Sequence, residues 1–138
     1  MSTDQDIIQY IPQRFPMVML SSLNYANQSE VQTCLEIKDE NIFVENGRLM
    51  APGIVENIAQ SVAARAGYLA KLQNSEVPLG FIGAIQNLEI LDLPKVGGKI
   101  ETTVIFEHEI FNASIVSGTV RLNEKIIAHC KMKIFVNS

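Results

Sequence analysis

The longest apolar pattern in the chain has helical spacing and runs from Arg48 to Leu72 (RLMAPGIVENIAQSVAARAGYLAKL). Apolar and small residues recur there every three or four positions, which is the period of one helix face. One row holds Ile54, Ile58, Val62, Ala66 and Ala70, and the row beside it holds Val55, Ala59, Ala63 and Gly67. Pro52 marks the start, since its fixed φ suits a first helical turn. We expect about five turns of buried helix.

Two features of this helix bear on what can approach it. Ala59, Ala63, Ala66, Gly67 and Ala70 give it a face of small side chains, to which a sheet or a second helix can come close. Gly53, in the first turn, is expected to leave the first backbone N–H groups unshielded. Those groups lie at the positive end of the helix dipole and suit a carbonyl or anionic oxygen.

Strand patterns lie on both sides of the helix. Before it, residues 17–23 and 31–38 predict a hairpin, with Val31, Thr33, Leu35 and Ile37 sharing one face of the second strand. Residues 39–48 predict a loop with Ile42, Phe43 and Val44 as buried anchors. After the helix, strands are predicted at 79–91, 100–110, 112–122 and 125–135.

The N-terminal residues predict a different kind of segment. Residues 4–10 are compatible with a short helix, but Pro12 and Pro16 force an extended or turning path through IPQRFP. We expect an irregular arm that packs across the domain. Together these elements predict an α+β fold in which five or six antiparallel strands curl around one long helix. An uncovered sheet edge then favours a dimer.

Composition narrows the class of protein. A chain of 138 residues with 47% apolar content fits a single domain over 1–138. No apolar run is long enough to cross a bilayer, and MSTDQDIIQY carries acids where a secretion signal carries bases, so a cytoplasmic protein is expected. The net charge of −4 disfavours a nucleic-acid partner. Cys34 and Cys130 are expected in the core, and no motif predicts a metal site or a cofactor.

Glu56 and Gln60 are the candidate polar residues of the helix. They share one edge of its apolar stripe, and neither has a Lys or Arg three or four positions away. A carboxylate at the margin of an apolar face is a candidate for proton transfer. The alternative, more common from spacing alone, is that Glu56 lies in the first turn because an acid favours the helix dipole there.

Three stretches of the sequence resemble the hot-dog-fold family of β-hydroxyacyl-acyl-carrier-protein dehydratases. They are IPQRFPMVML, PGIVENIAQSVAA and LGFIGAIQNLEILDLPKVGGKI, and the order of elements is also the same. The resemblance implies a hot-dog fold and removal of water from a 3-hydroxyacyl thioester. It also implies that Glu56 is the acid–base residue, that the amide of Gly53 or Ile54 holds the thioester carbonyl, and that Gln60 closes the motif.

The sequence departs from the family pattern at the catalytic histidine. The family carries that His in the loop before the helix, where this chain reads FVENGRLMA, and Gln13 stands where the N-terminal motif has His. NGRLMAPGIVENIAQ is more similar to a divergent branch found among polyene and pigment biosynthesis proteins, which keeps the helix Glu without the loop His. Asn46 and Arg48 are candidates to orient a substrate, or are simply turn and surface residues.

Two histidines remain to assist Glu56. His129 alternates with lysines on the last strand and is expected at the surface. His108 shares strand parity with Val104 and Phe106 and is expected to be a hydrogen-bonded core residue. Either Glu56 therefore acts as both base and acid, or a second subunit of a different protein supplies the His.

Three functions fit these observations. The first is a dehydratase for a 3-hydroxyacyl thioester, carried by an acyl carrier protein or by coenzyme A. The second is a non-catalytic hot-dog subunit that binds an acyl chain or pairs with an active dehydratase. The third is an acyl thioesterase, in which a helix carboxylate activates water. A homodimer or a heterodimer with another hot-dog subunit is expected, without nucleic acid or membrane, and the acyl chain length is not readable.

Overall fold

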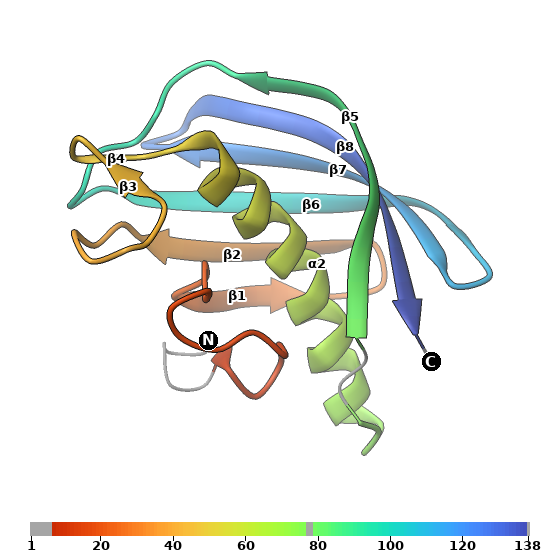
Figure 1. The fold of residues 1–138 in the computed structure, drawn as a ribbon. Helices are drawn as coiled ribbons and strands as arrows, with labels where there is room; N and C mark the ends of the chain where they lie inside the picture. Colours follow the sequence, from red (N-terminus) through yellow and green to blue (C-terminus); the bar gives the residue numbers. More distant parts are fainter. Residues whose placement is uncertain (1–6, 77–78, 138) are drawn as a thin grey trace.

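One long helix lies in the hollow of a curved antiparallel sheet (Figure 1). The structure is a computed structural model and describes residues 7–76 and 79–137. Helix α2 spans Ala51–Leu72. Six strands form the main sheet in the order β1-β2-β6-β7-β8-β5, and β3 and β4 form a separate hairpin. The strands are β1 Ser22–Ala26, β2 Glu30–Glu36, β3 Val44–Glu45, β4 Arg48–Leu49, β5 Leu79–Ile90, β6 Lys99–Ile110, β7 Ala113–Leu122 and β8 Lys125–Asn137.

The predicted α+β architecture is confirmed, and the elements from the helix onward lie where their patterns indicate. The helix begins at Ala51, with Pro52 in its first turn, and ends at Leu72. The four strands after it agree with their predicted ranges to within two residues at each end. These segments have strong periodicity, and each is long enough for its own pattern to decide its structure.

The strand predicted at 17–23 is wrong, because the first strand begins only at Ser22 and continues through the polar residues to Ala26. The backbone of Met19 forms its hydrogen bonds with side chains of the helix instead of with a strand. Its N–H donates to Gln60 Oε1 at 2.7 Å, and its carbonyl accepts from Asn57 Nδ2 at 2.8 Å. Met19 and Leu20 are buried in the core, whereas Met17 is exposed. An apolar strand pattern does not distinguish such core packing from pairing in a sheet.

The segment predicted as a loop before the helix contains the β3–β4 hairpin. Asn46 and Gly47 form its turn with φ of 53° and 74°. Two successive positive φ values are typical of a type I′ turn, which favours Asn-Gly. Of the predicted anchors, Phe43 and Val44 are partly buried, whereas Ile42 is exposed, so that part of the prediction is wrong.

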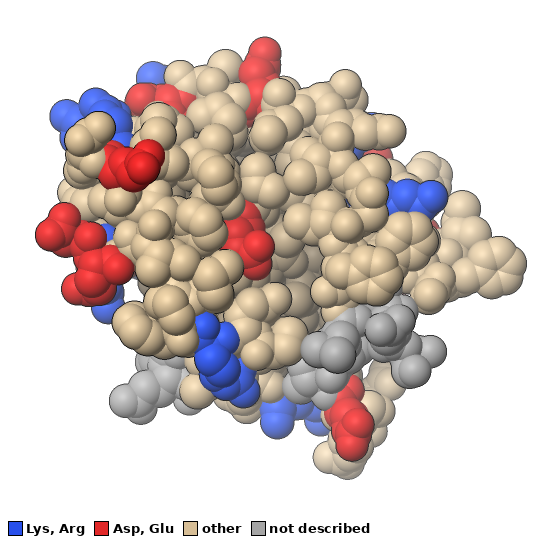
Figure 2. Space-filling view, viewed as in Figure 1, with Lys and Arg blue, Asp and Glu red and all other residues tan. Residues whose placement is uncertain are grey.

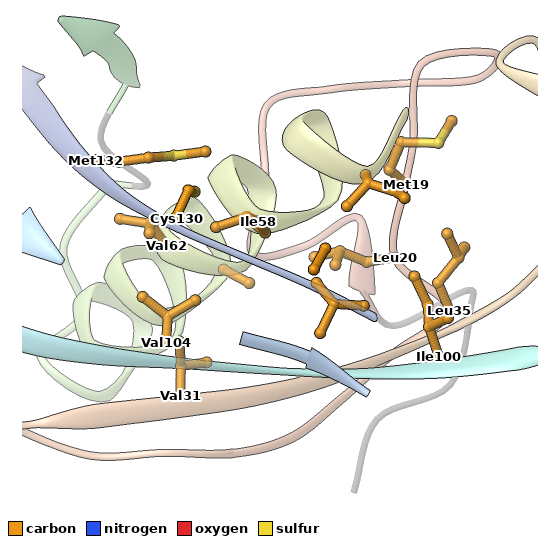
Figure 3. Packing of buried hydrophobic residues seen from close by; sticks show 14 of the residues in the cluster. Met19, Leu20, Val31, Leu35, Ile58, Val62, Ile100, Val104, Cys130 and Met132 are labelled. Carbon is orange, nitrogen blue, oxygen red and sulfur yellow. The ribbon is translucent and has the colours of Figure 1, made fainter. Parts of the chain in front are cut away.

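The core lies between α2 and the inner face of the sheet (Figure 3). Ile54, Ile58 and Val62 supply its helix side and are all at most 3% exposed. The predicted inner face of the second strand is confirmed, because Val31, Thr33 and Leu35 in β2 are buried, as is Ile37 just after it. The two cysteines are buried free thiols, as expected, and burial raises the pKa of Cys130 to about 11.

Two β-bulges change which face of the sheet the side chains occupy, which simple alternation does not predict. In β8, pairing with β7 shifts between Ala128 and Ile126, so Ile127 turns inward and Ile126 outward. In β6, the register shifts between Phe106 and His108, and the strand continues past the core. His108 is therefore exposed, and its predicted core position is wrong.

The N-terminal arm packs across the domain, as predicted, and it lies against the helix. Ile7 and Ile11 are almost completely buried, and the rings of Tyr10 and Tyr68 meet edge to face at 5.6 Å. The arm comes so close at Gly67 that an added Cβ would lie 1.9 Å from the Tyr10 carbonyl oxygen. Residues 4–6 of the short helix predicted at 4–10 lie outside the described residues, Ile7 is helical, and residues 8–10 form a turn.

Candidate active site

A cavity of about 220 Å³ lies between the helix, the N-terminal arm and strands β5 and β8. Small residues on one helix face leave this space open. Two of the lining residues have polar side chains, and the other lining residues have none. The lining residues are Gln13, Glu56, Ala59, Val62, Ala63, Ala66, Gly80, Phe81, Ile82 and Ile134.

Glu56 brings a carboxylate to this cavity from the second turn of the helix. It is partly buried, and its Oε2 accepts a hydrogen bond from Gln60 Nε2 at 2.8 Å. The helix begins at Ala51 and has no acidic residue in its first turn, so the interpretation of Glu56 as a first-turn dipole partner is wrong. In the described part of the chain, no basic side chain forms an ion pair with it.

Both polar atoms of the Gln60 side-chain amide form hydrogen bonds that hold Glu56 and the N-terminal arm in place. It is completely buried, and its Nε2 donates to the Met17 carbonyl at 2.7 Å as well as to Glu56. Its Oε1 accepts from the Met19 N–H. One amide thus orients the carboxylate and ties the arm to the helix. Gln60 does not line the cavity, so the contacts favour positioning of Glu56 over direct substrate binding.

We predict that Gln60→Leu lowers the free energy of unfolding by about 2 kcal/mol, because it leaves the Met19 amide and the Met17 carbonyl without their partner. Urea unfolding of the variant and the wild type measures the difference. Gln73→Leu, at the exposed end of the helix, is the matched control and is expected to change stability by less than about 0.5 kcal/mol. Equal stability of the Gln60 variant and the wild type would contradict the positioning role.

The first amides of the helix are not unshielded as expected. The N–H groups of Gly53 and Ile54 point to the Met50 carbonyl, at 2.9 Å and 3.3 Å. Gly53 is also covered, because an added Cβ would lie 2.7 Å from both Phe43 and Leu49 side-chain atoms. Neither Gly53 nor Ile54 lines the cavity. Their role toward a thioester carbonyl stays a prediction.

Asn46 and Arg48 lie away from the cavity lining. Asn46 is an exposed turn residue of the β3–β4 hairpin. Arg48 donates to the Leu93 carbonyl at 2.6 Å, and its guanidinium lies 3.8 Å from the Asp92 carboxylate. These contacts favour the turn and surface interpretation of both residues, and the structure does not bring them to Glu56.

A buried polar row on the helix was not predicted. Asn57, Ser61 and Arg65 lie four residues apart, facing the sheet, and are at most 6% exposed. Asn57 Oδ1 accepts from Thr102 at 2.5 Å, and Ser61 shares a hydrogen bond with Thr33 at 2.8 Å. The sequence contained one signal for their burial. These residues are spaced four apart, like the neighbouring core residues Ile54 and Ile58.

Arg65 completes this row at the far end of the sheet. Its guanidinium donates to the backbone carbonyls of Asn27 and Gln28 at 2.8 Å and 2.7 Å. It also stacks on Phe106, with 3.8 Å from Cζ to the ring centroid. Burial lowers the pKa of Arg65. The row fixes the rotation of the helix, and that rotation directs Glu56 toward the cavity.

Neither histidine of the chain lines the cavity. His129 is partly exposed on β8, as expected, and its Nε2 lies 2.8 Å from Glu89 Oε1. His108 is exposed near the end of β6. Any histidine that assists Glu56 must therefore come from another chain.

The described residues contain no group of three or more His, Cys, Asp or Glu side chains placed to hold a metal ion. In the same part of the chain, no helix combines the length and the apolar character needed to cross a membrane.

Solved structures with the same fold include three informative cases. The dehydratase heterocomplex ApeI:P from Xenorhabdus doucetiae superposes with a TM-score of 0.89 at 14% identity, covering 96% of this chain and 91% of that one. An uncharacterised protein from Pyrococcus horikoshii gives 0.72 at 15%, covering 94% and 92%. A hypothetical thioesterase from Streptococcus pneumoniae, solved with coenzyme A, gives 0.68 at 9%, covering 85% of each chain. At these identities the likeness establishes the hot-dog fold alone.

Comparison by sequence gives the family. No curated protein sequence matches the chain. The family described as ApeP-like, ApeP dehydratase, matches residues 5–138, which is nearly the whole chain. The match includes the arm with Gln13, the helix with Glu56 and all six strands of the main sheet. This chain therefore belongs to the ApeP-like dehydratase family.

Proposed function

We propose that this protein is a dehydratase subunit that acts on a 3-hydroxyacyl thioester with Glu56 as its acid–base residue. The observation that carries the proposal is the carboxylate of Glu56 in an otherwise mostly apolar cavity, oriented by a buried amide at 2.8 Å. An acyl chain suits the apolar lining, and the carboxylate supplies the proton chemistry. Membership of a dehydratase family supports the reaction type.

The reaction needs three groups around the substrate. A base removes the proton from the carbon next to the thioester carbonyl, an acid protonates the leaving hydroxyl, and a donor stabilises the developing enolate oxygen. Glu56 is suited to take the first proton, and a histidine that would protonate the hydroxyl is not among the residues that line the cavity. The donor for the enolate oxygen is predicted at the amide of Gly53 or Ile54. Both amides donate to the Met50 carbonyl, so the first turn has to release one of them when substrate binds.

A second hot-dog subunit is the proposed source of the missing group. Strand β5 lies at an edge of the main sheet, and Gly80, Phe81 and Ile82 in it line the cavity. Phe81, Ile85 and Leu88 expose large apolar side chains along this strand. A partner strand that pairs with β5 would cover them and reach the cavity mouth. The structural likeness to one chain of a dehydratase heterocomplex supports a partner of a different sequence.

The surface around the helix suits such a partner. In Figure 2, the face that carries α2 is mostly uncharged apart from an acidic group near its centre, and the other charged side chains lie mainly toward its rim. A largely uncharged face with a charged rim is typical of protein interfaces. An acyl carrier protein, which resemblance to the family implies as the thioester carrier, would then approach from outside this interface.

The test is an assay of two products from one thioester. Conversion between a 3-hydroxyacyl and a 2-enoyl thioester is followed by enoyl absorbance, and free thiol is measured in parallel. The protein is assayed alone and mixed with a hot-dog dehydratase that has the loop His. We expect a stable complex that interconverts the two thioesters without releasing thiol. Thiol release without interconversion would favour a thioesterase, and failure of both association and turnover would overturn the proposal.

A further inference from the structure

Gln13 has an unusual side-chain carbonyl. Its Oε1 is shielded from solvent, and within the described part of the chain no hydrogen-bond donor reaches it. It is the one buried side-chain nitrogen or oxygen in that part of the chain left in this state. Buried polar atoms are almost always paired, because an unpaired one loses its bonds to water without replacement. The Gln13 acceptor therefore requires a functional or structural reason.

The position of Gln13 indicates the reason. It lines the cavity together with Glu56, and these are the two polar side chains among the lining residues. The remaining surface is aliphatic or aromatic. A substrate bound there meets only one uncharged polar side chain. Because Oε1 is shielded in the empty cavity, the amide has to rotate about its last side-chain bond, whose energy profile is broad, to present this acceptor to an O–H or N–H group of the substrate.

The arm holds Gln13 at a fixed place relative to Glu56. On one side, Arg14 Nη1 donates to the carbonyls of Ile11 and Gln13 at 2.7 Å and 2.8 Å. On the other side, Gln60 holds the Met17 carbonyl with the same amide that orients Glu56. The carboxylate and the Gln13 amide thus share one rigid support. A site that contacts two different atoms of one substrate needs such a fixed separation between its two groups.

We propose that Gln13 is the specificity-determining residue of this site, and that its side-chain carbonyl accepts a hydrogen bond from the hydroxyl of a 3-hydroxyacyl chain. The inference rests on the proposed function. The hydroxyl is the one donor that separates a 3-hydroxyacyl substrate from its 2-enoyl product and from a saturated chain. Binding of the hydroxyl satisfies the open acceptor, whereas the other chains leave it unpaired. Gln13 therefore favours binding of the hydrated chain.

The test compares two ligands that cannot react. They are the pantetheine thioethers of a 3-hydroxyhexyl and a hexyl chain, in which the missing carbonyl prevents both proton abstraction and hydrolysis. Dissociation constants are measured by calorimetry for the wild type and for Gln13→Met, which keeps the length but not the polar atoms. We expect the wild type to prefer the hydroxylated ligand about tenfold and the variant to show less than about a twofold preference.

Two further measurements make the result specific. Pantetheine alone, which carries its own amide N–H groups, is expected to bind wild type and variant equally. The same substitution at an exposed glutamine, Gln28→Met, is expected to keep the tenfold preference. Gln13→Leu serves in the same experiment if the Met variant does not fold, which circular dichroism and thermal unfolding establish.

The proposal is overturned if the Gln13 variant keeps the preference for the hydroxylated ligand. It is also overturned if the variant weakens pantetheine as much as both acyl ligands, since the contact would then be to the carrier arm. These outcomes are separate from catalysis. Loss of the preference in a protein that turns over no thioester supports the Gln13 contact and contradicts the proposed function. An unchanged preference in a protein whose turnover requires Glu56 contradicts the Gln13 contact and supports the proposed function.

Discussion

Glu56→Gln is expected to lower the rate of 2-enoyl thioester hydration at least about 100-fold, which is the lower range for loss of a general acid–base group. The amide has nearly the shape of the carboxylate, and its oxygen can still accept from Gln60 Nε2. It cannot take a proton from the substrate. The rate is measured in the complex with a His-containing subunit, by loss of enoyl absorbance.

The control for this prediction is a second Glu→Gln substitution. Glu101 is exposed on β6 and does not line the cavity, so Glu101→Gln makes the same change of charge outside the site. We expect it to retain turnover to within about twofold, and both variants to unfold within about 1 kcal/mol of the wild type. Undiminished turnover in the Glu56 variant would remove that carboxylate from the mechanism.

Gly67→Ala is expected to destabilise the fold by about 3 kcal/mol, although helix propensity alone favours Ala over Gly by about 1 kcal/mol. The added Cβ would lie 1.9 Å from the Tyr10 carbonyl oxygen and 2.6 Å from its carbonyl carbon. Backbone atoms of the arm cannot turn aside as a flexible side chain does. The arm must therefore lift, which exposes Ile7 and Ile11 to water. Urea unfolding of the variant measures the loss.

A converse substitution in the same helix calibrates this result. Ala70→Gly, three residues further along, is expected to cost about 1 kcal/mol through propensity. If the arm is displaced, trypsin should also cleave the Gly67 variant after Arg14 faster than it cleaves the Ala70 variant. A Gly67→Ala protein as stable as the wild type would show that the arm is not packed on the helix as described.

Strong local periodicity predicted most of the fold. The helix repeats its apolar positions over 22 residues, so its own pattern decided its structure and its buried face. Glu56 and Gln60 were paired correctly, because four residues along a helix bring two side chains together wherever the helix lies. The long strands after the helix were likewise predicted from alternation and turn residues.

Predictions failed where a partner distant in the chain decided the structure. The apolar run at Met17–Leu20 reads as a strand, but helix side chains took the hydrogen bonds of Met19. His108 was assigned to the wrong face, because a one-residue bulge reverses every side chain beyond it and leaves no mark in the alternation.

By itself, the sequence determined the helix, its apolar stripe, most of the sheet and the carboxylate at the edge of that stripe. These properties depend on residues a few positions apart, whose geometry is the same in every helix or strand. Only the tertiary structure decided that the arm crosses Gly67, that Gln13 joins Glu56 at one cavity, and that the first-turn amides are covered. Those contacts join distant segments, and their formation depends on packing and hydrogen bonding over the whole domain.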